Sequence, residues 1–125
     1  MSEQKANKKV VAQHQEYNQC VNALKDYTMG DDVLFERLIT TLLRTIPENK
    51  DKLVKALSGN NYLQIRSVLH TLKPMFVMLD DETSIGISEG IRQEDETQWK
   101  KVVTMSQELI ERLEGIFQAV QRVEM

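Results

Sequence analysis

The sequence predicts an all-α protein whose helices pack as an antiparallel bundle with short connections. Apolar residues recur at intervals of three and four through most of the chain, which is the spacing of one face of an α-helix. No stretch alternates with the period of two expected of a half-buried strand, and no repeat of roughly 20 to 50 residues appears. The composition is 41% hydrophobic and 28% charged with only two prolines, as in ordinary soluble domains.

The length of 125 residues fits one domain. We expect a flexible N-terminus over residues 1–7, which are polar, and a single helical domain over residues 8–125. No apolar run reaches the about 18 residues of a membrane-spanning helix, and the first residues lack the apolar core of a signal peptide. The sequence therefore predicts a cytoplasmic protein that does not enter the membrane.

Charge and cysteine content exclude several classes of function. A net charge of −3 argues against nucleic-acid binding, which needs clustered cationic surface. The single cysteine, Cys20, excludes an internal disulfide and a multi-cysteine metal site, and we interpret it as a small apolar helix residue. His14 lies on an apolar helical face without a Glu or His at ligand spacing, so it is interpreted as a packed histidine. We expect neither a metal nor a cofactor.

The first two helices follow from periodicity and from stop signals. One apolar face of a first helix ends near Tyr27, before Gly30, and comprises Val10, His14, Tyr17, Val21 and Leu24. Asp31 or Asp32 can cap a second helix. Its apolar face comprises Val33, Phe35, Leu38, Ile39, Leu42, Leu43 and Ile46, and the pattern resumes with Leu53, Val54, Ala56 and Leu57. Because Pro47 interrupts this segment, we expect one long, kinked helix up to residues 58–61.

A third helix is predicted over residues 63–79, where seven residues form one apolar stripe at about 100° per residue. They are Ile65, Val68, Leu69, Leu72, Met75, Phe76 and Leu79. His70 points away from this stripe. Its helical neighbours are the cations Arg66 and Lys73 together with Ser67 and Pro74, and Leu63 and Val77 lie one turn further out. An outward histidine between two cations, with apolar residues around it, predicts a site for docking and chemistry.

Two further helices complete the expected order. Asp80 or Asp81 can cap a helix from Glu82 to Arg92, in which Gly86 and Gly90 either admit a close neighbour or make the segment flexible. The longest regular pattern then predicts a last helix of about seven turns. Its apolar face comprises Trp99, Val102, Val103, Ser106, Leu109, Ile110, Leu113, Ile116, Phe117 and Val120.

The tetrapeptide His70-Thr71-Leu72-Lys73 resembles the His-x-Leu-Lys motif of histidine-phosphotransfer (HPt) domains. Further similarities are Met29-Gly30-Asp31-Asp32 followed by Phe35, and Ala56-Leu57 with Asn60 ahead of the histidine helix. The similarity spans roughly residues 17–120. Two positions depart from the family pattern: Pro74 replaces a small residue after the lysine, and Asp80 replaces a frequent glycine.

The resemblance implies an HPt-like antiparallel four-helix bundle, here with an additional N-terminal helix. It implies that His70 accepts a phosphoryl group from a receiver-domain aspartate and passes it to another receiver domain. Lys73 and Arg66 would stabilise the added negative charge, and Leu63, Ser67, Pro74 and Val77 would contact the partner. The partners implied are response-regulator receiver domains and hybrid sensor kinases, with a divalent metal on the receiver.

Other functional classes remain open. The sequence contains no Gly-rich phosphate loop or kinase-like ATP site, so we expect a phosphocarrier without kinase activity. A conventional enzyme lacks support because no nucleophile or carboxylate pair is spaced to accompany His70. An HPt-fold adaptor that binds a receiver domain or another partner without transfer is the alternative. We expect a monomer.

Overall fold

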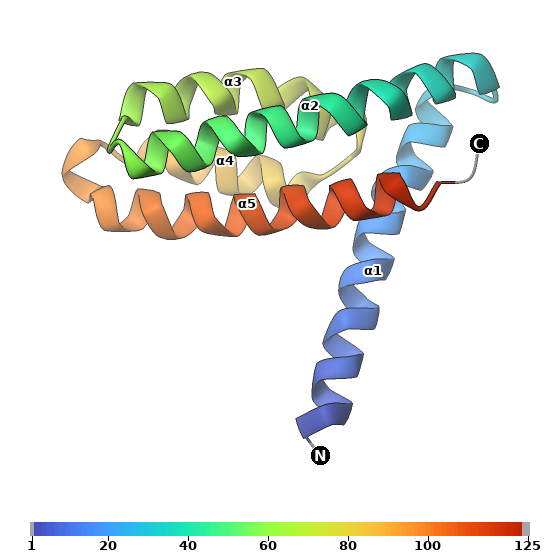
Figure 1. The fold of residues 1–125 in the computed structure, drawn as a ribbon, viewed down its shortest axis with the longest axis horizontal. Coiled ribbons are helices and arrows are strands. Elements are labelled where there is room, and N and C mark those ends of the chain that lie inside the picture. The colour runs from blue at the N-terminus through green and yellow to red at the C-terminus, as the bar shows by residue number, and fades with distance from the viewer. Residues whose placement is uncertain (1, 124–125) are drawn as a thin grey trace.

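The computed structural model describes residues 2–123, and it describes side chains over residues 15–123. These residues form five α-helices joined by short turns (Figure 1). They are α1 (Ser2–Tyr27), α2 (Asp32–Ser58), α3 (Tyr62–Met78), α4 (Glu82–Gln93) and α5 (Trp99–Gln121), with a short 3-10 helix, η1 (Glu96–Gln98), before α5. No strand occurs among the described residues, so the all-α prediction is confirmed.

The turns before α2 and α4 use caps that the sequence predicts, Asp31 and Asp81, and the turn before α3 uses Asn61. The side chains of Asp31, Asn61 and Asp81 accept hydrogen bonds from the backbone N–H groups three residues later and cap α2, α3 and α4. The residues just before these caps adopt left-handed backbone angles: φ is 83° at Gly30 and 53° at Asp80. Asp80 thus adopts the conformation for which a glycine is often used.

Helices α2, α3, α4 and α5 surround most of the core, and each packs against two of the other three. Consecutive members of this set run in opposite directions (Figure 1). The predicted stripe of α3 faces inward: Ile65, Leu72 and Phe76 are each at most 1% exposed. Burial of these large apolar side chains is the main force that holds the four helices together. Val33 and Val54 are exceptions to the pattern on α2, because they are 61% and 43% exposed.

Helix α2 continues through Pro47 without a break, which confirms one long helix. Of the two glycines of α4, only Gly90 has a close neighbour: a Cβ atom there would lie 3.1 Å from the Met105 sulfur of α5. A Cβ at Gly86 would meet nothing within 4 Å. The predicted close approach therefore holds at Gly90 and is wrong at Gly86.

Helix α1 packs with its second half and projects from the other helices with its first half (Figure 1). Tyr17, Val21 and Leu24 are buried as predicted, and Cys20 is buried beside them. The Tyr17 ring lies directly on Gly115 of α5, where a Cβ atom would overlap the ring. The predicted packing of Val10 and His14 lies outside the described side chains. The helix begins at Ser2 rather than near residue 8, and the flexibility of residues 1–7 stays a prediction.

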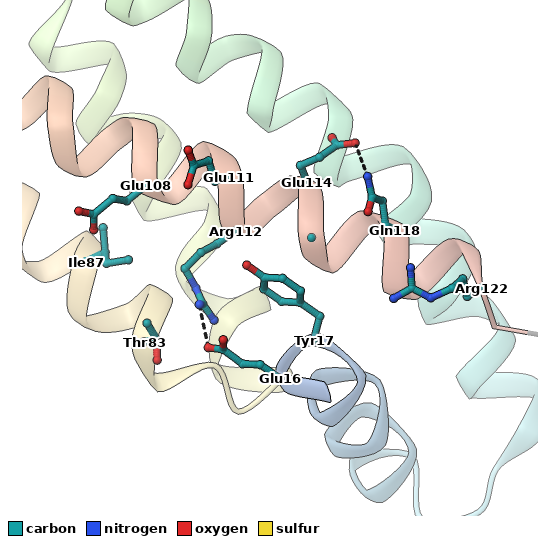
Figure 2. Close-up of a pocket in the computed structure, with 11 residues that line it drawn as sticks. Glu16, Tyr17, Thr83, Ile87, Glu108, Glu111, Arg112, Glu114, Gln118 and Arg122 are labelled. Atoms are coloured by element: carbon teal, nitrogen blue, oxygen red, sulfur yellow. Dashed lines mark hydrogen bonds and ion pairs between the residues drawn. The ribbon is translucent and has the colours of Figure 1, made fainter. Parts of the chain in front are cut away.

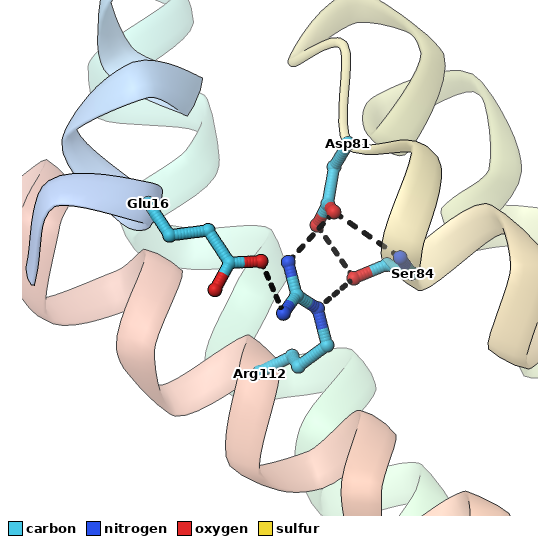
Figure 3. A network of polar contacts seen from close by, with 4 residues as sticks. All are labelled: Glu16, Asp81, Ser84 and Arg112. Carbon is cyan, nitrogen blue, oxygen red and sulfur yellow. Dashed lines mark hydrogen bonds and ion pairs between the residues drawn. The ribbon is translucent and has the colours of Figure 1, made fainter. Parts of the chain in front are cut away.

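A buried polar network fastens α1 to α4 and α5 (Figure 3). The Arg112 guanidinium donates to Asp81 Oδ1 at 2.8 Å, Glu16 Oε1 at 2.8 Å and Ser84 Oγ at 2.7 Å. It also lies 5.3 Å from the centre of the Tyr17 ring. Burial alone would lower the pKa of Arg112, but the neighbouring carboxylates raise it above its usual value. Arg112 therefore stays charged and joins three helices.

Candidate functional site

His70 lies on the outer face of α3 and is exposed, as predicted. The helix phase that buries Leu69 and Leu72 turns the intervening imidazole outward. Arg66, Ser67, Lys73 and Pro74 are exposed on the same helix. The imidazole is therefore accessible to another macromolecule, with a cation one turn away on each side.

A shallow hollow of about 520 Å³ adjoins the imidazole. His70, Lys73, Pro74, Val77 and Met78 of α3 line it, together with Tyr27 from the end of α1. Tyr27 and Val77 are 60% and 59% exposed, so both add apolar surface to the hollow. Several such groups around one histidine form a surface suited to a protein partner.

The structure brings four of the predicted site residues to this hollow: His70, Lys73, Pro74 and Val77. Leu63, Arg66 and Ser67 are exposed on α3 but do not line it. Leu63 is 72% exposed. The roles assigned to all seven residues stay predictions.

Arg66 lies over the Tyr62 ring, with its guanidinium carbon 5.9 Å from the ring centre. The Tyr62 hydroxyl donates to the backbone carbonyl of Glu94. Tyr62 is buried and anchored in this way, so the contact places the Arg66 guanidinium over a fixed ring at the start of α3. Of the two cations beside His70, Lys73 is the one that reaches the hollow.

Lys73 also contacts α4. Its Nζ lies 3.7 Å from Oε1 of Glu89, and the two side chains are 52% and 45% exposed. The ammonium group thus stands between the hollow and a carboxylate of the neighbouring helix. Neither Glu89 nor Tyr27 was singled out from the sequence, because their positions near α3 depend on helix packing and not on a local motif.

A second hollow of about 490 Å³ lies where α1, α4 and α5 meet (Figure 2). Glu16, Glu108, Glu111 and Glu114 place carboxylates around it, and Arg112 also lines it. The Arg112 donors are already bonded to Asp81, Glu16 and Ser84. Lys50 pairs with Glu114 at 2.7 Å and lowers the pKa of that carboxyl. We interpret this region as the anchorage of α1.

The part of the chain that the structure describes shows neither a metal site nor a reactive thiol. Residues 15–123 contain no group of three His, Cys, Asp or Glu side chains placed to hold a metal ion. Burial raises the pKa of Cys20 to about 12, so its thiol stays protonated at neutral pH. Among the described helices, none has the length and apolar content needed to cross a membrane.

Comparisons with protein-family models, curated proteins and solved structures find no match to this chain. The similarity to HPt domains therefore rests on the sequence motifs alone.

Proposed function

We propose that this protein is an HPt phosphocarrier, in which His70 accepts a phosphoryl group from the aspartate of one receiver domain and gives it to another. The main support is one observation: the exposed His70 imidazole and the Lys73 side chain line the same largely apolar hollow. The imidazole would supply the nucleophile and the cation would supply charge stabilisation. The hollow would supply a docking surface.

The packing supports an HPt-like arrangement as part of this proposal. Helices α2 to α5 would be the antiparallel four-helix bundle of the family, because each packs against two of the others. Helix α1 would be the additional N-terminal helix. In this arrangement α3 carries the histidine, and α1 contributes Tyr27 to the surface next to it.

The transfer step requires little of the carrier beyond position and charge. The lone pair of the unprotonated imidazole nitrogen forms a bond to phosphorus while the P–O bond to the receiver's aspartate breaks. The carboxylate leaves with the electron pair. The reverse step, toward a second receiver, regenerates the free imidazole.

Lys73 and Arg66 lie at different distances from the hollow beside His70, so they would contribute differently to this step. Lys73 adjoins the hollow and would meet the incoming phosphoryl oxygens, whereas Arg66 is held beside Tyr62 and would add only to the positive field. The acidic residues and the divalent metal would come from the receiver domain. The chain would act as a carrier without ATP binding or kinase activity.

Docking would use the exposed residues around His70. Val77 and Pro74 line the hollow itself, Tyr27 extends it toward α1, and Leu63 and Ser67 lie toward the start of α3. Response-regulator receiver domains and hybrid sensor kinases present the complementary surface in this proposal.

Two variants separate a carrier from an adaptor that only binds. If Lys73 steadies the phosphoryl group in flight, Lys73→Ala slows transfer more than it weakens docking, because the new charge exists only at the reacting centre. One partly exposed charge-assisted contact bounds the effect at on the order of 1 to 3 kcal/mol, or roughly five- to 150-fold in rate. Val77→Asp, in contrast, weakens binding of phosphorylated and unphosphorylated receivers alike.

The measurement is stopped-flow transfer from phosphorylated receiver domains alongside equilibrium binding for both variants. Equal losses of rate and affinity in Lys73→Ala would leave the lysine as a docking contact only. A wild-type protein that binds receivers but never acquires an acid-labile, alkali-stable label would support the adaptor instead.

A further inference from the structure

The ion pair between Lys73 and Glu89 joins a cation of the proposed site to a carboxylate of α4. Lys73 is the cation that adjoins both His70 and the hollow, yet its ammonium lies 3.7 Å from a carboxylate oxygen of α4. Glu89 does not line the hollow. The ion pair therefore attracts the Lys73 ammonium toward α4 as long as His70 carries no phosphoryl group.

A phosphoryl group on His70 would compete with Glu89 for the same ammonium. Lys73 lies three residues after His70, a spacing that places the two side chains side by side on one helical face. The phosphoryl group carries a charge of about −1.5 to −2 near neutral pH, and the carboxylate carries one negative charge. Both pair members are about half exposed, so the ion pair is weak enough to exchange.

We propose that Glu89 is the resident counter-ion of Lys73, and that it sets how strongly Lys73 stabilises a phosphoryl group on His70. This inference rests on the proposed role of His70. Glu89 is a positioning residue because it acts through Lys73 and does not touch the reacting atoms. It limits the stability of the phosphorylated form, so the phosphoryl group is held less tightly and is passed on more readily.

The test measures the pKa of the phosphoryl group on His70, which depends on the charges around it, and it needs no receiver domain. Phosphoramidate, a small-molecule donor, phosphorylates the imidazole: a nitrogen of the ring bonds to phosphorus, the donor's P–N bond breaks, and ammonia leaves with the displaced proton. All variants carry His14→Gln, so that His70 is the single histidine. The pKa of the phosphoryl group is then measured by phosphorus NMR from alkaline to mildly acidic pH.

Glu89→Gln leaves Lys73 without its carboxylate partner, so the ammonium pairs more fully with the dianionic form. We expect the pKa of the phosphoryl group to fall by about 0.3 to 0.7, which corresponds to a two- to fivefold change in proton affinity for a half-exposed pair. The same substitution in a Lys73→Ala background should produce less than half of that shift. Glu82→Gln is the matched control, because it removes the same charge from the exposed first turn of α4.

No shift in Glu89→Gln, or an equal shift with and without Lys73, would overturn the inference, because Glu89 would then act by its own field or not at all. Failure of phosphoramidate to label His70 would also overturn it. The proposed relay function is judged separately: a protein that takes phosphoryl groups from phosphoramidate but never from receivers fails as a carrier, while the Lys73-dependent shift can still be present.

Discussion

Replacing Arg112 by methionine tests the structural account of how α1 is held. The substitution keeps most of the apolar stem but removes the guanidinium, which donates to Asp81 and Glu16 at 2.8 Å each. The Asp81 side chain is 2% exposed, so its carboxylate would be left buried without a cation. Breaking a buried ion pair from one side typically costs about 3 to 5 kcal/mol. That is a large share of the about 5 to 15 kcal/mol that stabilises a domain.

The assay is urea unfolding followed by circular dichroism, with a double-mutant cycle as its control. Asp81→Asn keeps a side chain that caps α4 but removes the charge. Adding it to Arg112→Met should therefore recover much of the lost stability, since no buried charge remains. A loss below about 1 kcal/mol in Arg112→Met would show that Asp81 does not depend on the Arg112 charge, as would a double variant less stable than Arg112→Met alone.

Three further expectations concern stability and reactivity. Leu72→Ala should lower the free energy of unfolding by about 2 to 5 kcal/mol, because Leu72 is 1% exposed. A variant that melts like the parent would show that the predicted buried face of α3 is wrong. His70→Gln should change stability by no more than about 0.5 kcal/mol, because the imidazole is exposed; a large drop in melting temperature would contradict this. The Cys20 thiol should react with a thiol reagent far more slowly in the folded protein than in urea. Folding raises the pKa of Cys20 from 9.0 to about 12, so the contribution of the neutral thiol to the free energy of unfolding is present below pH 9.0 and is lost as the pH rises toward about 12. A rise in stability over that range in the wild type relative to Cys20→Ala would contradict the burial of this thiol.

Local chemistry was enough to predict the helices and the orientation of α3. Burial of Leu72 and exposure of His70 both follow from one helical period, and Asp81 was recognisable as a cap from its place before Glu82. Asp80 tolerates the left-handed turn because a short polar side chain permits that backbone conformation.

Contacts between distant segments could not be predicted in the same way. Arg112 has the charge of a surface residue, and its partners Glu16 and Asp81 lie 96 and 31 residues away in the chain. Tyr27 reaches the hollow beside His70 only because α1 folds back against α3. The contact between Gly115 and Tyr17 likewise depends on how two helices cross. Periodicity identifies which face of a helix is buried, but not which residue of another helix covers it.

His70 is the proposed acceptor of a phosphoryl group from a receiver domain. The most direct test incubates the wild-type protein and His70→Gln with phosphorylated receiver domains, and then locates any phosphate by mass spectrometry under alkaline conditions. We predict one phosphoryl group on His70 in the wild type and none in the variant, with both proteins folded and both binding the receiver. Absence of label from the wild type, or label that persists in His70→Gln, would contradict this role of His70.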